Sequence, residues 1–280
     1  MKKLLVGLFL SVLVLALAAC GADKKEDASS DKADSKENVT LKVGASNTPH
    51  AVILEKAKPI LAKEGIDLII EPYQDYVLPN QDLESGDLDA NYFQHIPYLN
   101  LQIKDNGYDF VNAGGVHIEP IGIYSKKYKS LEDLPEGATI LLSSSVSDHG
   151  RMLSLLEAKG LIKLKEGIDK TAAEIKDIVE NPKNFKFDAN TAPEMLVQMY
   201  ENNEGDAVLI NSNFAIDNGL NPLEDAISLE DKESPYVNIV AVRKGDETKQ
   251  EIKKLLEVLK SKEIQDFIIE EWKGAVVPVK

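Results

Sequence analysis

Short apolar runs alternate with segments of helical periodicity from residue 39 to the end of this 280-residue chain. Residues 41–45 (LKVGA) and 66–70 (IDLII) have the composition of buried strands, and residues 51–61 between them repeat apolar side chains at helical spacing. A strand, a helix and a strand in this order form a βαβ unit, in which the two strands lie parallel in one sheet. The alternation therefore predicts an α/β fold.

The same alternation continues through the rest of the chain. Further strands are expected at residues 138–142, 206–210 and 236–243, and further helices at residues 97–106, 148–159, 247–261 and 262–272. Residues 171–174 (TAAE) and 191–194 (TAPE) have the capping-box pattern that is typical of a helix start.

This order of elements fits two α/β lobes. We expect residues 39–120 together with 236–280 to form lobe I, and residues 121–235 to form lobe II. Ligands of open α/β sheets bind beyond the carboxyl ends of the strands. The segments that follow strands are therefore the places to look for a binding site.

The first twenty residues differ in composition from the rest. Two lysines precede a nearly unbroken apolar run from residue 4 to residue 18, which is shorter than the roughly 20 residues that a transmembrane helix needs. The run leads into the sequence LAAC, which resembles the lipobox where bacteria attach diacylglycerol to a cysteine. We expect a signal peptide at residues 1–19 and lipid attachment at Cys20, with an uncleaved anchor helix as the alternative.

Residues 20–38 are rich in Asp, Lys, Glu, Ser and Ala and contain no aromatic side chain. Such a segment cannot bury enough apolar surface to fold, so we expect a disordered tether. Cys20 is the only cysteine, so no disulfide can form within the chain. Because two or three acyl chains bind a bilayer stably, we expect the protein at the cell membrane, lipid-anchored on the extracytoplasmic face.

The net charge of −15 argues against a nucleic-acid partner, because such a surface cannot neutralise phosphates. The sequence contains no Gly-x-Ser-x-Gly, His-Glu-x-x-His, Walker loop or Gly-x-Gly-x-x-Gly motif. We therefore expect no catalytic residues, no cofactor and no enzymatic activity.

The four histidines, His50, His95, His117 and His149, are scattered and lack the spacing of metal ligands. No metal site is therefore expected. A metal receptor that uses His50, His95 and His149 stays open as an alternative, because these three lie in segments that could face a ligand.

Residues 143–151 (SSSVSDHGR) lie between a predicted strand and a predicted helix. A turn of this kind points backbone N–H groups and the positive end of a helix dipole toward a ligand. Arg151 could add a guanidinium that pairs with a carboxylate. The alternative is a solvated arginine on a surface helix.

Residues 89–95 (DANYFQH) combine aromatic, amide and imidazole side chains. This mixture suits a ligand with an apolar side chain and a polar head, or a loop whose aromatic rings fill the core. Asn211 and Asn213 follow a predicted strand, where their amides could bind an amino group and a carboxylate. They could equally cap the helix that follows.

Several stretches, in this order and spacing, resemble the methionine-binding lipoproteins of bacterial ABC importers, the NlpA/MetQ-type family, over nearly all of residues 39–278. They are residues 75–80 (DYVLPN), 86–91 (GDLDAN), 93–99 (FQHIPYL), 124–127 (YSKK), 160–164 (GLIKL), 177–184 (DIVENPKN) and 234–238 (SPYVN). The resemblance implies a two-lobed periplasmic-binding-protein type II fold with a ligand cleft between the lobes.

The resemblance also implies a binding site. Tyr76, Phe93 and Tyr98 would line an apolar slot for the ligand side chain, with His95 beside them. Arg151 would pair with the ligand carboxylate. The remaining implied residues would contact the amino and carboxylate groups or serve as additional candidates: Asn211 and Asn238, and then Asn91, Asn213 and His50.

The implied function is capture of L-methionine and its delivery to a membrane permease driven by an ATPase. The expected partners are thus an amino acid or short peptide, the permease with its ATPase, and the membrane, with the protein itself a monomer. A role in adhesion or host interaction is a further alternative that the lipid anchor permits.

The chain departs from the family pattern in two places. The loop before the arginine usually resembles Pro-Asn-Asp-Pro-x-Asn-x-Gly-Arg, whereas residues 143–151 read SSSVSDHGR. Thr191 stands where a glutamine often precedes the proline. Both changes lie near the expected ligand, so D-methionine, a Met-containing dipeptide or another apolar amino acid are alternative ligands.

Overall fold

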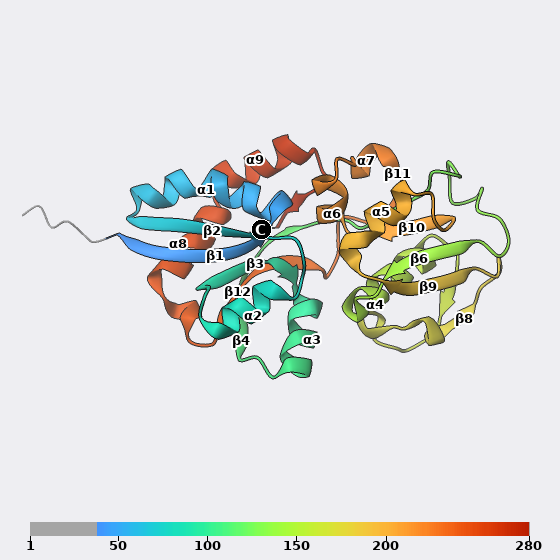
Figure 1. The fold of residues 1–280 in the computed structure, drawn as a ribbon, viewed down its shortest axis with the longest axis horizontal. Helices are drawn as coiled ribbons and strands as arrows, with labels where there is room; N and C mark the ends of the chain where they lie inside the picture. Colours follow the sequence, from blue (N-terminus) through green and yellow to red (C-terminus); the bar gives the residue numbers. More distant parts are fainter. Residues whose placement is uncertain (1–37, 280) are drawn as a thin grey trace, which may run out of the picture. The chain divides into compact units, whose positions relative to one another are not determined.

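The computed structural model describes residues 38–279, which belong to one compact unit. The predicted signal peptide, Cys20 and the predicted tether up to residue 37 lie outside the described residues. Within residues 38–279, no helix combines the length and the apolar character needed to cross a membrane. Two main sheets organise this part of the chain (Figure 1).

The first sheet has six strands in the order β13-β4-β12-β3-β1-β2. Their bounds are β1 Val39–Ser46, β2 Ile66–Tyr73, β3 Ala90–His95, β4 Phe110–Ile118, β12 Val237–Arg243 and β13 Val277–Pro278. β1 pairs in parallel with β2 and β3, whereas β12 runs antiparallel to β3 and β4. Helix α1 (Val52–Lys63) connects β1 to β2, which confirms the predicted βαβ unit.

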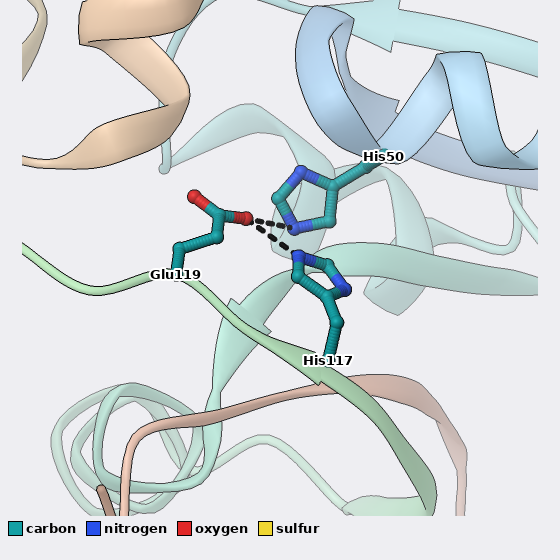
Figure 2. A group of neighbouring side chains, drawn as sticks. All are labelled: His50, His117 and Glu119. Atoms are coloured by element: carbon teal, nitrogen blue, oxygen red, sulfur yellow. Dashed lines mark hydrogen bonds and ion pairs between the residues drawn. The ribbon is translucent and has the colours of Figure 1, made fainter. Parts of the chain in front are cut away.

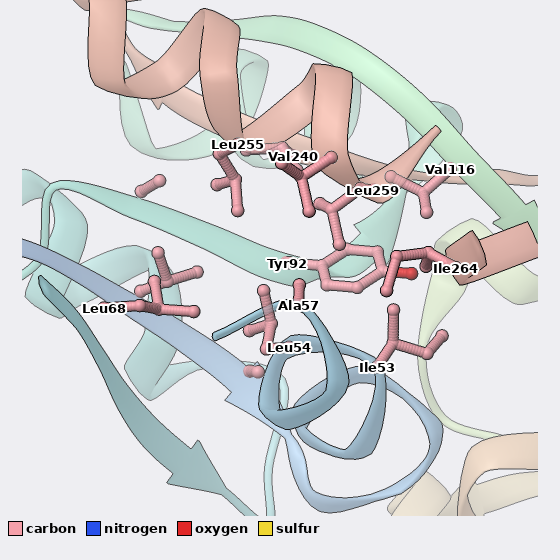
Figure 3. Packing of buried hydrophobic residues seen from close by; sticks show 14 of the residues in the cluster. Ile53, Leu54, Ala57, Leu68, Tyr92, Val116, Val240, Leu255, Leu259 and Ile264 are labelled. Carbon is pink, nitrogen blue, oxygen red and sulfur yellow. The ribbon is translucent and has the colours of Figure 1, made fainter. Parts of the chain in front are cut away.

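Both faces of this sheet are covered. Val240 and Val242 of β12 belong to a core shared with α1, α8 (Gln250–Leu259) and α9 (Lys262–Trp272), part of which Figure 3 shows. The alternate residues Ile239 and Ala241 pack in a second cluster with side chains of α2 (Leu78–Ser85) and α3 (Ile96–Asn106). Because successive side chains of a strand point to opposite faces, this alternation places one core on each side of the sheet.

The second sheet has five strands in the order β11-β5-β10-β6-β9. Their bounds are β5 Gly122–Tyr124, β6 Thr139–Ser143, β9 Lys186–Thr191, β10 Ala207–Ile210 and β11 Ala226–Leu229. The α-helices in the same part of the chain are α4 Val146–Ala158, α5 Leu196–Glu201, α6 Ser212–Asp217 and α7 Pro222–Asp225, and a small two-stranded sheet joins β7 (Lys163–Leu164) to β8 (Ile178–Glu180).

Two connections link the sheets. One runs from the end of β4 at Ile118 to the start of β5 at Gly122, and the other from the end of β11 at Leu229 to the start of β12 at Val237. The α/β fold with two lobes is thus confirmed, each lobe having its own mixed sheet. The lobe boundaries at 120/121 and 235/236 stay predictions.

The predicted helix start at residues 171–174 is wrong. The structure has only two 3₁₀ turns there, Lys170–Ala172 and Ile175–Asp177. The first turn packs so closely on α4 that a Cβ atom at Gly150 would collide with the backbone carbonyl oxygens of Lys170 and Thr171. Tertiary packing, rather than local capping, therefore sets the shape of this segment.

Candidate functional site

A cavity is lined by side chains associated with both sheets. The lining residues are Tyr76, Phe93, Gln94, His95, Tyr98, Glu119, Asp148, Arg151, Asn211, Ser212, Asn213 and Asn238.

The structure brings most of the predicted site residues together. The lining includes Tyr76, Phe93, His95, Tyr98, Arg151, Asn211 and Asn238, as well as the additional candidate Asn213. It does not include the other additional candidates, Asn91 and His50. Contact between any of these residues and a ligand stays a prediction.

Three aromatic rings form the apolar part of the cavity. The ring centroids of Tyr76, Phe93 and Tyr98 lie 5.9 to 6.1 Å from one another. Tyr98 donates its hydroxyl hydrogen to the Tyr76 carbonyl oxygen, and Tyr76 donates its own to Asn213 Oδ1, both over 2.7 Å. Burial raises the pKa of both tyrosines, so they stay neutral. Both tyrosine hydroxyls are therefore already hydrogen-bonded, and the three rings present apolar faces and edges to the cavity.

Arg151 lies on α4 with its side chain almost entirely buried. Its Nε and Nη2 atoms donate to Glu230 Oε2 at 2.9 and 2.5 Å, and Nη2 also donates to the Glu119 carbonyl oxygen. The guanidinium carbon lies 4.8 Å from the centre of the Tyr236 ring. Burial would lower the pKa of Arg151, but Glu230 raises it above its ordinary value. The guanidinium is therefore charged, and Nη1 has no hydrogen bond to any described residue.

Asp148, three residues before Arg151, is also buried in the cavity wall. Its Oδ1 lies 3.1 Å from His95 Nε2, and its Oδ2 accepts from Asn211 Nδ2 over 3.1 Å. His95 Nδ1 accepts from the Tyr98 backbone N–H, so the imidazole hydrogen that faces Asp148 is on Nε2. Burial would raise the pKa of Asp148, but the His95 hydrogen bond and nearby positive charge lower it below its ordinary value.

Asn211 is the N-cap residue of α6, but its side chain does not cap the helix. Its Nδ2 instead donates to Asp148, and its buried Oδ1 has no hydrogen-bond partner within residues 38–279. The alternative of a helix-capping amide is therefore wrong for Asn211. An unpartnered amide oxygen at a cavity wall is suited to accept a hydrogen from a ligand.

A second group of polar side chains lies at the Glu119 end of the cavity (Figure 2). Glu119 Oε1 is 2.7 Å from His117 Nε2 and 3.2 Å from His50 Nε2. Burial lowers the pKa of His50 to about 4 and that of His117 to about 3. Burial also raises the pKa of Glu119, although His50 and Arg151 oppose this effect.

The alternative of a metal site built from His50, His95 and His149 is wrong. Among the described residues, the His, Asp and Glu side chains close enough to share an ion are His50, His117 and Glu119. His95 instead pairs with Asp148, and His149 Nε2 lies 2.8 Å from the Ser143 carbonyl oxygen.

Asn91 lies outside the cavity because its amide belongs to a structural network. Its Nδ2 donates to the Pro79 carbonyl oxygen and to Asn80 Oδ1, and its Oδ1 accepts from Gln94. These bonds attach the first turn of α2 to β3. The expected ligand contact of Asn91 therefore has no support in the geometry.

Glu119, Asp148 and Glu230 were not predicted from the sequence. His117 and Glu119 are two residues apart at the end of a strand, so a shared face could have suggested Glu119. Asp148 lies in the same segment as Arg151, residues 143–151. Glu230 is 79 residues from Arg151, and no local pattern indicates their pairing.

The chain is similar to known proteins over its described length. The NlpA lipoprotein family model matches residues 41–280. The methionine-binding lipoprotein MetQ of Bacillus subtilis is 50% identical over 281 residues, which span 100% of this chain and 99% of that protein.

Two solved structures share the fold. A pheromone cOB1 precursor/lipoprotein of the YaeC family from Enterococcus faecalis has a TM-score of 0.84 and 60% identity, covering 86% of this chain and 100% of that one. A nutrient-binding protein from Burkholderia cenocepacia bound to methionine has a TM-score of 0.81 and 41% identity, covering 86% and 100%. The chain therefore belongs to the NlpA lipoprotein family.

Proposed function

We propose that the protein is the substrate-binding lipoprotein of an ABC importer, which captures L-methionine in the cavity and delivers it to a membrane permease. One observation carries this proposal: the cavity has an apolar aromatic end and a polar end with a guanidinium and an unpartnered amide oxygen. A zwitterionic amino acid with an apolar side chain matches both ends. The relatives named for methionine support the same ligand.

Each part of methionine has a chemical counterpart. The thioether would lie between Tyr76, Phe93 and Tyr98, where sulfur–aromatic contacts contribute roughly 0.3–1.5 kcal/mol. The carboxylate would bind Arg151 through Nη1, the guanidinium nitrogen that Glu230 does not occupy. The amides of Asn211 and Asn238 would bind the polar head, since an unpaired buried charge is costly.

The ligand would also hold the two lobes together. Tyr76 and His95 come from the side of the six-stranded sheet, and their partners Asn213 and Asp148 come from the side of the five-stranded sheet. A ligand that contacts both sides stabilises the closed form by its differential affinity for that form. The proposed lobes are residues 39–120 with 236–280, and residues 121–235.

Lipid attachment at Cys20 would keep the receptor on the extracytoplasmic face, close to its permease and ATPase. Residues 21–38 would allow the folded part to stand off the bilayer. We propose that the protein works as a monomer, without a cofactor and without catalytic activity. Replacing Cys20 by Ala should release the protein from the membrane fraction, and retention of that variant in the membrane would contradict the assignment.

Calorimetric titration of the purified, ligand-stripped protein with L-methionine tests the ligand. We expect one binding site per chain and a rise in melting temperature that grows with ligand concentration. The absence of both heat and thermal shift would exclude L-methionine.

The same titration decides between the alternative ligands D-methionine, a Gly-Met dipeptide and norleucine. Asp148 adds a second carboxylate where the family often has a neutral asparagine. The ranking of these ligands shows whether this change alters ligand preference. Binding that disappears on addition of a chelator would instead favour a metal receptor.

A further inference from the structure

The Glu119 carboxylate is held in one orientation by two buried imidazole rings. Its Oε1 lies at hydrogen-bond distance from both Nε2 atoms, while His50 and His117 are at most 1% exposed (Figure 2). Glu119 itself is 5% exposed and lines the cavity. The group therefore belongs to the cavity wall, although only Glu119 reaches the cavity.

The neighbours of each ring determine where its hydrogen lies. His117 Nδ1 faces the hydroxyl of Tyr92, whose raised pKa keeps its hydrogen available for donation. The hydrogen of the neutral His117 ring is then on Nε2, pointing at Glu119. His50 Nε2 lies between two acceptors, Asn238 Oδ1 at 3.0 Å and Glu119 Oε1 at 3.2 Å, so it also carries the hydrogen.

The second carboxylate oxygen is directed elsewhere. Figure 2 shows Oε2 pointing away from both rings, and the side chains of the described residues that donate to Glu119 reach Oε1. The Asn213 backbone N–H is a further hydrogen-bonding neighbour of this carboxylate and lowers its pKa. Asn211 Oδ1, which lacks a partner among the described residues, lines the same cavity. The polar end of the cavity thus offers a carboxylate oxygen and an amide oxygen, both of which are acceptors.

We propose that Glu119 binds the α-ammonium group of the ligand, with His50 and His117 as positioning residues that hold its carboxylate by neutral hydrogen bonds. The inference rests on the proposed function and specifies its substrate class: ligands must carry an unmodified ammonium group. Arg151 then binds the carboxylate of the zwitterionic ligand, and Glu119 binds its ammonium group.

The same three residues could be considered as metal ligands, but the hydrogen-bond arrangement favours the ammonium role. A bound zinc ion would need unprotonated Nε2 atoms at about 2.0–2.1 Å. Here the Nε2 hydrogens already have an acceptor, Glu119 Oε1, at hydrogen-bond distance. Both Nε2 atoms therefore act as hydrogen-bond donors and present no lone pair to an ion in this arrangement.

The test compares L-methionine with 4-(methylthio)butanoate, which is the same molecule without its amino group. Calorimetry on the full chain should show that Glu119→Gln weakens methionine about 10- to 100-fold, as expected for loss of a hydrogen bond to a charged group. The same substitution should leave the affinity for the desamino analogue unchanged or raise it. Equal losses for both ligands, or none for methionine, would refute the ammonium role.

Two further variants separate positioning from simple damage to the fold. His117→Leu removes the Nε2–H donor and should weaken methionine selectively, and His117→Gln, which retains an N–H donor, should recover part of the loss. Nitrogen NMR of the ligand-stripped protein should show both rings neutral with the hydrogen on Nε2. A Glu119-dependent site for zinc, with methionine affinity unaffected by Glu119→Gln, would establish a metal site instead.

Failure of the proposed function gives a different pattern. If the unsubstituted protein binds neither methionine, Gly-Met nor norleucine, the importer assignment fails and the ammonium role fails with it. If the unsubstituted protein binds methionine but does not distinguish it from the desamino analogue, only the role of Glu119 fails.

Discussion

Arg151 and Glu119 are both buried ionisable side chains that line the same cavity, but different kinds of partner hold them. Arg151 is paired with an opposite charge, Glu230, and stacks on Tyr236. Glu119 is held by two neutral imidazoles whose own pKa values burial has lowered.

This difference decides what each end offers a ligand. In the proposed complex, the ligand carboxylate would share the Arg151 guanidinium with Glu230, which leaves Nη1 for the ligand. At the other end, two neutral imidazole donors orient the Glu119 carboxyl group without adding a positive charge of their own. The guanidinium end therefore gains stability from its ion pair, whereas under the proposal Glu119 would find its opposite charge in the ligand ammonium group.

The largest expected effect is at the ion-paired end. Arg151→Ala should weaken L-methionine on the order of 1,000-fold, because the ligand carboxylate and Glu230 both lose their cation in a buried site. Arg243→Ala is the matched control, since Arg243 donates to the carbonyl oxygens of Leu83 and Leu88 and does not line the cavity. Calorimetry and circular dichroism on both variants check this, and a folded Arg151→Ala protein with near-normal affinity would remove Arg151 from the site.

A smaller effect is expected at the Glu119 end of the cavity, where His117 should make the free energy of unfolding depend on pH. His117 has a pKa of about 3 in the folded protein, against 6.5 when unperturbed, so the unfolded chain binds more protons between these values. The free energy of unfolding should therefore rise with pH across this window and fall as the pH drops. Between about pH 4.5 and about pH 7, His117 should raise the free energy of unfolding by about 2–3 kcal/mol.

The variant His117→Gln cannot titrate and isolates this contribution. Glu119 acts in the opposite direction, because its pKa is raised, and His50 acts in the same direction as His117. These neighbours stay in both proteins, so the difference between the two denaturation profiles reports His117. Identical pH profiles would mean that His117 is not held neutral by burial.

The sequence allowed prediction of the α/β fold because apolar periodicity is a local property. The strand at residues 206–210 and the helices at 97–106 and 262–272 appear close to their expected positions, as β10, α3 and α9. The segment at residues 171–174 was mispredicted because its conformation depends on contact with α4 at Gly150. The edge strand β11 is as short as β10, but it is only partly buried, so its sequence lacks the continuous apolar run that marks β10.

The candidate site follows the same division. Phe93 and Arg151 belong to local patterns and Tyr76 was implied by the family resemblance, and all three line one cavity. The partners that set their electrostatics come from distant positions: Glu230 approaches Arg151, and His50 approaches Glu119, only after the chain folds. Sequence reasoning therefore found the aromatic residues and Arg151, but it missed Glu119 and Asp148 in the cavity wall and Glu230, the partner of Arg151.

The smallest expected effect is at a contact that involves no charge. Tyr76→Phe removes the hydroxyl that donates to Asn213 Oδ1 between the two sides of the cavity. A neutral hydrogen bond contributes roughly 0.5–1.5 kcal/mol, so methionine affinity should fall only about 2- to 10-fold. Tyr124→Phe is the control, because the buried Tyr124 hydroxyl has no partner in the described part of the chain.

Calorimetry on these two tyrosine variants gives the loss of affinity for an uncharged contact, against which the losses at Arg151 and Glu119 can be ranked. If Tyr76→Phe weakened binding as much as Arg151→Ala, closure between the lobes rather than charge would dominate affinity. If Glu119→Gln weakened methionine binding only as much as Tyr76→Phe, Glu119 would contribute no more to affinity than an uncharged hydrogen-bond acceptor. The contrast between the two ends of the cavity therefore depends on Glu119 ranking above Tyr76.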